Sequence, residues 1–137
     1  MAKIKYDFNV MKYISLFESL TGAKVKDCIA DESIIFIIAE NEIGKAVGKK
    51  GSNIKRIEGL LKKKIKVIEF NSDIALFVRN LLYPTEIKEV KQEEGILNIY
   101  ATDTKTRGII IGRDHSKINW VKEILKRYFD IKEIKVL

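Results

Sequence analysis

An internal repeat with a spacing of 64 residues constrains the fold more than any other feature of the sequence. Shifting residues 44–62 forward by 64 superposes identical residues, pairing Gly44 with Gly108, Gly48 with Gly112, Ser52 with Ser116, Ile54 with Ile118, Leu61 with Leu125 and Lys62 with Lys126. A repeat of this length indicates two copies of one supersecondary unit. In a chain of 137 residues, each copy has about the size of the smallest domains that fold alone. We therefore expect two domains, residues 1–70 and 71–137.

Hydrophobic periodicity predicts the same order of elements in both copies, namely helix, strand, strand, helix, helix, strand. In the first copy the expected elements are a helix at 8–20, strands at 24–29 and 33–39, a helical turn at 43–47, a helix at 52–63 and a strand at 65–70. In the second they are a helix at 74–83 capped by Ser72 and Asp73, strands at 86–91 and 95–101, a short turn near 105–111, a helix at 116–128 and a strand at 132–136. This pattern predicts an α+β fold with helices packed on three-stranded sheets.

Positive charge is concentrated in one segment of the chain. Residues 44–66 hold nine lysine or arginine residues and one acid, a net charge of +8, whereas the whole chain carries +7. A charge that only kept the protein soluble would be spread more evenly. The segment therefore indicates a polyanionic partner at one place on the surface.

Within this segment, the glycine turn Gly48-Lys49-Lys50-Gly51 lies between two predicted helices, with aliphatic residues on both sides. Glycines allow the backbone of a phosphodiester chain to approach closely, and lysines neutralise its charge. Amides of the turn and of the next helix would face phosphate oxygens. The pattern predicts a site where single-stranded RNA is held by its backbone while its bases lie over an aliphatic groove.

The turn and its frame resemble the G-x-x-G arrangement of KH domains. The segments IGKAVGKKGSNIKRIEGLLKKKIKVIEF and RGIIIGRDHSKINWVKEILKRYF together resemble the short archaeal NusA-like transcription factors. The resemblance implies two tandem type II KH domains. It also implies that the protein acts on nascent RNA in elongation, termination or antitermination, with RNA polymerase as a second candidate partner.

The expected RNA-binding residues come from both copies. They are Ile43, Lys45, Val47, Gly48, Lys49, Lys50, Gly51, Ser52, Asn53, Ile54, Lys55 and Arg56 in the first copy, and Arg107, Gly112, Arg113, His115, Ser116 and Lys117 in the second.

The second copy departs from the motif in its turn. His115 stands in the place of Gly51, and Asp114 adds a negative charge, so we expect a weaker grip on phosphate there. Two interpretations of His115 stay open: it contacts RNA, or it is a partly exposed turn residue that caps or packs locally. Trp120 has the chemistry to stack on a base, but packing within an amphipathic helix is the favoured interpretation.

Enzymatic chemistry is not expected. The glycines of Gly44-x-x-x-Gly48-x-x-Gly51 match neither a P-loop nor a dinucleotide-binding fingerprint. The chain has one histidine and one cysteine, Cys28, which we expect to be a small buried apolar residue. No metal, cofactor or small-molecule substrate is therefore expected. No apolar stretch approaches the roughly 18 residues of a membrane span and no signal peptide is recognised, so we expect no membrane partner and a cytoplasmic location.

Three alternative functions are compatible with a related fold or surface. The first is a ribosomal or ribosome-biogenesis KH protein, and the second is a module for single-stranded DNA. The third, a protein-interaction surface, applies mainly to the second copy. An RNA-recognition motif is disfavoured, because the strand at 33–39 offers only one aromatic residue for stacking, Phe36.

Overall fold

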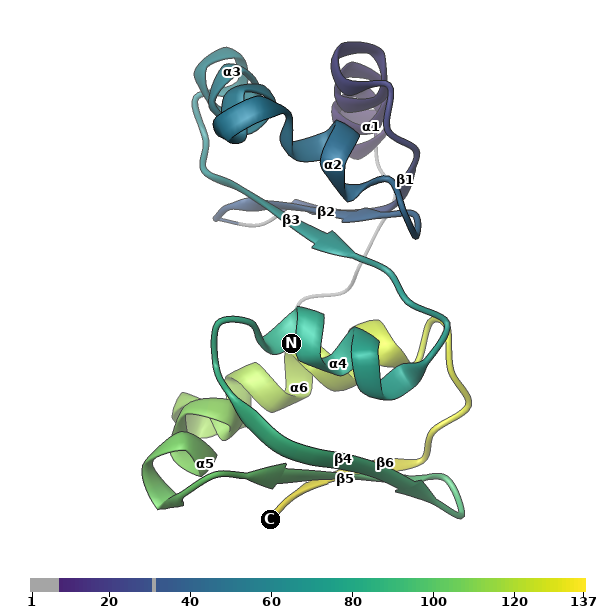
Figure 1. Cartoon of the computed structure of the whole chain (residues 1–137), viewed down its shortest axis with the longest axis vertical. Coiled ribbons are helices and arrows are strands. Elements are labelled where there is room, and N and C mark those ends of the chain that lie inside the picture. The colour runs from purple at the N-terminus through teal and green to yellow at the C-terminus, as the bar shows by residue number, and fades with distance from the viewer. Residues whose placement is uncertain (1–7, 31) are drawn as a thin grey trace. The chain divides into compact units, whose positions relative to one another are not determined.

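A computed structural model of the chain describes residues 8–30 and 32–137. The described chain divides into two compact units, with the boundary in the sequence between Asn71 and Ser72 (Figure 1). Unit 1 contains α1 (Phe8–Thr21), β1 (Val25–Ala30), β2 (Ile34–Ile38), α2 (Ile43–Val47), the 3-10 turn η1 (Lys49–Gly51), α3 (Ser52–Leu61) and β3 (Ile65–Glu69). Unit 2 contains α4 (Ile74–Leu82), β4 (Ile87–Glu93), β5 (Ile96–Ala101), α5 (Thr104–Ile111), η2 (Arg113–His115), α6 (Ser116–Leu125) and β6 (Glu133–Val136).

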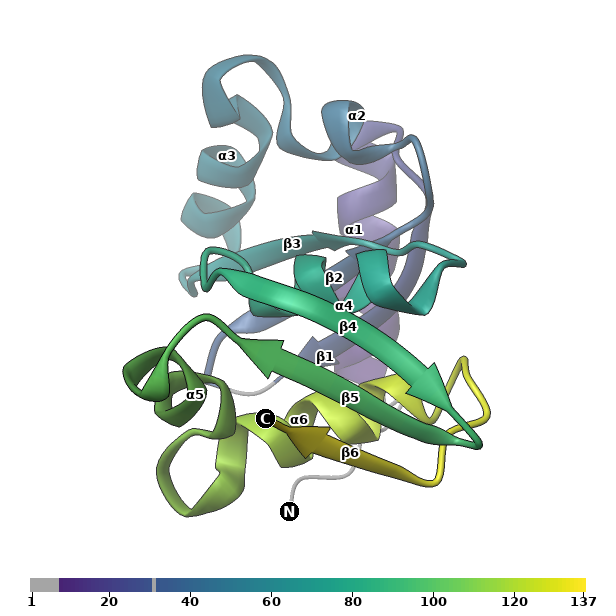
Figure 2. The same ribbon diagram turned by 60° about the horizontal axis from the view of Figure 1, so that its bottom comes forward.

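Both units have a three-stranded mixed sheet. The order is β1-β2-β3 in unit 1 and β4-β5-β6 in unit 2. The first pair of each sheet is antiparallel and the second is parallel, and Figure 2 shows β5 between β4 and β6. Within each unit the helices cover one face of the sheet (Figure 1). The predicted α+β class and the predicted order of elements are confirmed.

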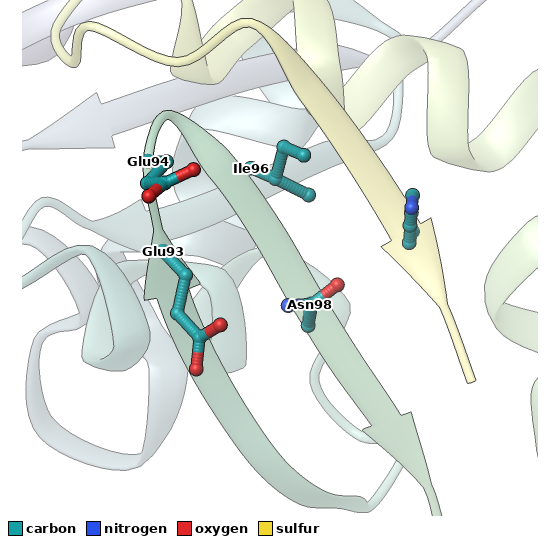
Figure 3. A pocket seen from close by; sticks show the side chains of 5 residues that line it. Glu93, Glu94, Ile96 and Asn98 are labelled. Atoms are coloured by element: carbon teal, nitrogen blue, oxygen red, sulfur yellow. The ribbon is translucent and has the colours of Figure 1, made fainter.

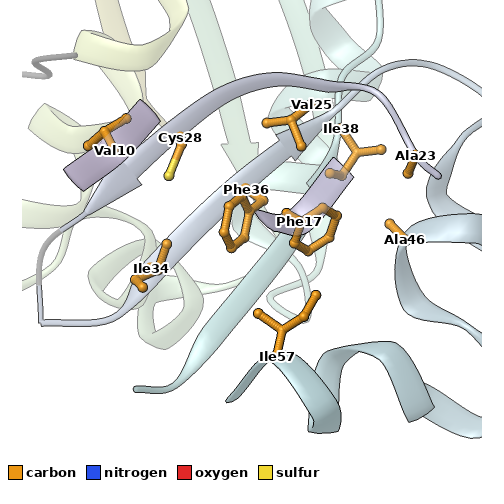
Figure 4. Packing of buried hydrophobic residues seen from close by; sticks show 10 residues of the cluster. All are labelled: Val10, Phe17, Ala23, Val25, Cys28, Ile34, Phe36, Ile38, Ala46 and Ile57. Atoms are coloured by element: carbon orange, nitrogen blue, oxygen red, sulfur yellow. The ribbon is translucent and has the colours of Figure 1, made fainter. Parts of the chain in front are cut away.

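The core of unit 1 positions the two helices that flank the glycine turn. Phe17 of α1 lies against Phe36 of β2, with ring centroids 4.3 Å apart. Ala46 of α2 and Ile57 of α3 are fully buried in the same cluster (Figure 4). Burial of an isoleucine side chain such as that of Ile57 stabilises the folded state by about 1.5–3 kcal/mol. Ile43 of α2 and Leu61 of α3 also pack against the cluster, so the turn between the two helices is held at both ends.

Cys28 of β1 belongs to this cluster and is fully buried, as the sequence predicts. No helix within residues 8–30 and 32–137 is long and apolar enough to cross a membrane.

Helix starts in unit 2 follow ordinary capping chemistry. The Asp73 carboxylate accepts the amide of Ala75 at 2.9 Å, which confirms a predicted cap of α4. At α5 the Asp103 carboxylate accepts the amide of Thr106 at 2.7 Å, and this bond lowers the pKa of Asp103. Such caps satisfy amides that have no partner inside the helix.

Several predicted boundaries were wrong. The segment near 105–111 is a helix of eight residues, not a short turn. Helix α6 ends at Leu125, three residues early, because Arg127 and Tyr128 donate to carbonyls three residues back and the chain tightens into a turn. Phe129 then lies beside Phe77, with ring centroids 6.2 Å apart.

Two further boundaries differ by two residues each. Helix α3 ends at Leu61, not at 63, because Lys62 adopts a left-handed conformation. Strand β4 extends to Glu93, beyond the predicted end at 91, because its pairing with β5 continues to Ile96.

Candidate nucleic-acid interface

The first glycine of the turn is required by its backbone and by its neighbours. Gly48 has φ 76° and ψ 174°, a conformation that is essentially restricted to glycine. A Cβ atom at Gly48 would lie 2.8 Å from the side-chain Cγ of Asn53 and 2.9 Å from Oγ of Ser52. The start of α3 therefore packs directly on Gly48, and no side chain fits there without displacing the side chains of Asn53 and Ser52.

The second glycine faces open space. Gly51 has φ 74° and ψ 18° in the left-handed region, and within the described part of the chain a Cβ atom built on it would meet nothing within 4 Å. Its lack of a side chain therefore serves no packing purpose inside the protein. The position leaves room for a ligand backbone, which is the property that the sequence pattern predicted.

The two lysines between the glycines are free to meet a ligand. Lys49 and Lys50 are both exposed, and Lys50 is itself left-handed at φ 56° and ψ 30°. Across residues 8–30 and 32–137, neither ammonium group forms an ion pair. Two positive charges are thus presented beside the open face of Gly51.

The amides of the turn are only partly available, which corrects the expectation that they face phosphate as a group. The amide of Gly51 donates to the carbonyl of Gly48 at 3.2 Å. The amide of Ser52 donates to the carbonyl of Lys49. These two bonds hold the turn in shape and engage the two amides within the protein.

Asn53 fixes the turn from within. Its Nδ2 atom donates to the carbonyl of Lys45 at 2.8 Å, so it satisfies the last turn of α2 from the first turn of α3. Sequence reasoning placed Asn53 among the RNA contacts and missed this role. The bond links the two helices across the glycine turn.

Lys45 is not a free cation. Its ammonium group lies 3.1 Å from the Glu42 carboxylate, which also accepts the amide of Lys24 at 3.1 Å. The bond to Lys45 and then the bond to Lys24 lower the pKa of Glu42. The Glu42 carboxylate thus links the start of α2 to Lys24, the residue before β1, and a contact of Lys45 with phosphate stays a prediction.

The aliphatic frame has a buried part and an accessible part. Ile57 is fully buried and Ile43 packs on the core, whereas Val47 and Ile54 are half-buried beside the turn. Ser52, Lys55 and Arg56 are exposed along α3. The turn is thus bordered by partly exposed apolar surface on one side and by cations on the other.

The turn of unit 2 has the same backbone with different side chains. Gly112 has φ 77° and ψ 170°, Asp114 has φ 53° and ψ 33°, and His115 has φ 62° and ψ 18°. Each value lies close to that of its counterpart in Gly48, Lys50 and Gly51. His115 is exposed and its side chain makes no capping hydrogen bond to α6, so one of the two local roles considered for it is not found.

The other predicted contacts of unit 2 have mixed surroundings. Arg113 and Ser116 are exposed. Arg107 donates from Nε to the carbonyl of Val136 at 3.1 Å, which ties α5 to the last strand. The Lys117 ammonium lies 4.3 Å from the ring centroid of Trp120, and that ring is half-buried. Arg107 and Lys117 are therefore more engaged within the protein than Lys49 and Lys50 are.

A pocket of about 590 Å³ lies on the sheet of unit 2 and is a poor candidate for RNA. It is lined by Glu93, Glu94, Ile96, Asn98 and Lys135 (Figure 3). Leu97 and Ile99 alternate with two of these residues along β5 and are fully buried, so the pocket lies on the outer face of the sheet. Two carboxylates against one lysine would repel a phosphodiester chain.

Metal ligands do not gather anywhere in the described chain. Residues 8–30 and 32–137 contain no group of three or more histidine, cysteine, aspartate or glutamate side chains with the arrangement of a metal site.

The order of elements and the glycine turn define a protein of the KH class. The family model described as "KH domain" matches residues 12–95, which run from α1 past the end of β4. The protein called "Probable transcription termination protein NusA" from Methanococcus vannielii is 36% identical, with 98% of this chain and 80% of the relative covered. The protein of the same name from Halococcus morrhuae is 35% identical, with 92% and 93% covered. The chain belongs to this archaeal NusA-like family of KH-domain proteins.

A solved structure supports the fold over nearly the whole length. The crystal structure of a protein designated APE1850 has a TM-score of 0.72 and 28% sequence identity, and the match covers 96% of this chain and 100% of that one.

Proposed function

We propose that the protein binds single-stranded RNA through two tandem type II KH domains, residues 1–70 and 71–137, and acts on nascent RNA during transcription. The observation that carries the proposal is the turn of unit 1, where Gly51 is open to space beside two exposed lysines without ion-pair partners. The shared backbone of the two turns supports a second KH domain in residues 71–137. The name of the relatives supports a role in termination, with RNA polymerase as a further partner in the cytoplasm.

The proposed contacts keep the predicted residues but assign them different weights. Lys49, Lys50, Lys55 and Arg56 neutralise phosphates, whereas Val47 and Ile54 lie under the bases. Gly48 and Asn53 remain in the proposed set and in addition shape the turn. No step of the proposal requires bond making or breaking by the protein.

Titration of matched single-stranded RNA and DNA oligonucleotides tests this function. We expect RNA to bind more tightly than DNA of the same sequence, because a 2′-hydroxyl allows a protein to distinguish the two. Equal affinity for both would favour a general single-strand binder. A lack of binding to either would contradict the proposal.

Salt dependence tests whether the two lysines of the turn contact phosphate. Each phosphate neutralised on a single strand contributes a slope of about −0.7 to log affinity against log salt. We expect the double variant Lys49→Ala, Lys50→Ala to make the slope shallower by about 1.4. The matched control Lys88→Ala, Lys132→Ala removes two exposed lysines of unit 2 and should leave the slope unchanged. A parental slope in the first variant would show that its lysines are solvated surface only.

The two units should contribute unequally. Residues 104–127 hold seven basic residues and two acids, a net charge of +5, compared with +8 in residues 44–66. Two linked sites still gain affinity through effective concentration when one strand spans both. We expect Gly51→Asp to weaken binding of both a short oligonucleotide and a long one, and Arg113→Ala with Lys117→Ala to weaken mainly the long one. Greater damage to the short ligand by the second variant would place the principal site in unit 2.

A further inference from the structure

Three consecutive lysines at the end of α3, Lys62, Lys63 and Lys64, lie outside the glycine turn. We call them the lysine triad. All three are exposed, and together with Glu58 they line a pocket of about 290 Å³. In the part of the chain that the structure describes, none of the three ammonium groups has an ion-pair partner. Like Lys49 and Lys50, they are therefore unneutralised.

The backbone of Lys62 is unusual for a lysine. It is the C-cap of α3, with φ 55° and ψ 37°, and its amide donates to the carbonyl of Glu58 at 2.8 Å. Helices that end in this left-handed conformation usually have glycine at that point. Its counterpart in unit 2, Lys126, has φ −64° and ψ −16° and carries no such strain. Unit 1 thus keeps a lysine where the conformation favours glycine, and strain of this kind is common at functional positions.

Glu58 offsets at most one of the three charges of the triad. Its carboxylate accepts the amide of Ile65 at 3.0 Å, which joins α3 to the start of β3. This bond holds the short connection that carries the three lysines. One carboxylate faces three ammonium groups, so the pocket keeps a net positive charge and suits an anion.

An exposed face of α3 connects the glycine turn to the triad. Ser52, Arg56 and Gly59 follow one another at intervals of four and three, which places them on one side of α3, and the triad follows the end of this helix. All three are exposed. A Cβ atom at Gly59 would meet no atom of the described residues within 4 Å, so the middle of this face is low and open. The ten residues of α3 rise about 15 Å from the turn to the triad.

We propose that the lysine triad is a second phosphate-binding site, and that it takes the backbone of the same RNA strand that the glycine turn holds. The strand passes over the open part of α3 at Gly59 and meets the triad beyond the nucleotides held at the turn. A G-x-x-G turn clamps roughly four nucleotides, so the triad engages only a longer ligand. This inference rests on the proposed function.

The triad is tested by replacing its three lysines with glutamine and titrating RNAs of about four and about ten nucleotides. We expect the affinity for the long RNA to fall about tenfold, with its salt slope shallower by about 2, and the affinity for the short RNA to stay within twofold. The control Lys88→Gln, Lys91→Gln, Lys132→Gln removes the same charge from unit 2 and should change neither affinity. Parental affinity and slope for the long RNA, or an equal loss for both RNAs, would overturn the second site.

Lys62→Gly separates binding from helix stability. Because glycine suits the left-handed C-cap, we expect this variant to melt at a higher temperature while it binds the long RNA more weakly. Lysines that only stabilised the helix end through its dipole would give the opposite pattern, a lower melting temperature with unchanged binding. A failure of the proposed function can be distinguished from a failure of the second site alone. If the glycine turn did not bind RNA, Gly51→Asp would also bind both RNAs as the parent does.

Discussion

Replacing Gly51 by aspartate is expected to weaken RNA binding about a hundredfold and to leave the fold intact. A carboxylate at this position points into the open space where we place a phosphate, and a juxtaposition of like charges costs several kcal/mol. About 2.7 kcal/mol of this cost corresponds to a hundredfold in affinity. The variant should fold, because no atom of residues 8–30 and 32–137 stands within 4 Å of the new Cβ and aspartate tolerates the left-handed region. Affinity is measured by titration and folding by circular dichroism.

Two controls make this experiment specific. Gly22→Asp places the same side chain on another left-handed glycine with open surroundings, at the end of α1, and should bind as the parent does. Gly51→His copies the turn of unit 2, where His115 has nearly the same backbone, and should bind less tightly than the parent but better than Gly51→Asp. Binding within twofold of the parent by Gly51→Asp, with an unchanged spectrum, would remove the glycine turn from the site.

Gly48→Ala is expected to damage the structure of the turn itself. Its backbone conformation is strained for any residue with a Cβ atom, and the new atom would stand 2.8 Å from the Asn53 side chain. We expect the free energy of unfolding to fall by about 2 kcal/mol and RNA binding to weaken in parallel. Gly112→Ala should be at least as costly to unit 2, because its Cβ would stand 2.8 Å from the backbone nitrogen of Lys117, which cannot rotate away.

Gly44→Ala is the matched control, since Gly44 lies inside α2 with open space around it. Alanine is favoured over glycine in a helix by up to about 1 kcal/mol, so this variant should be as stable as the parent or more so. Urea unfolding of the full chain compares the three variants. Equal stability of Gly48→Ala and Gly44→Ala would mean that the turn adjusts without cost, against the geometry described here.

The repeat made the architecture predictable. One shift of 64 residues placed the glycine turns, and the alternation of apolar residues gave the order of elements, because both signals are local in sequence. The open side of Gly51 was also expected from the motif. Helix ends were less predictable, since α6 ends where Arg127 and Tyr128 donate to carbonyls three residues back, a change of hydrogen bonding that apolar periodicity does not show.

The sequence did not show which residues of the basic segment are exposed to a ligand and which are engaged within the protein. Asn53 and Lys45 lie in the basic segment and have suitable chemistry, yet one caps α2 and the other is paired with Glu42. Composition cannot distinguish a cation that is paired from one that is free, because the difference depends on the spatial neighbour. The repeat offered one hint, since Asn53 aligns with Lys117 and the cap is therefore specific to unit 1.

Mapping the backbone amides of the isotope-labelled full chain by NMR, while a short single-stranded RNA is added, tests the central claim most directly. The account predicts that the largest shift changes occur at Gly48–Ser52 and along the first turn of α3, with smaller changes at Gly112–Ser116. Changes concentrated on the sheet of unit 2, around Glu93 and Asn98, with the amides of the glycine turn unmoved, would contradict it.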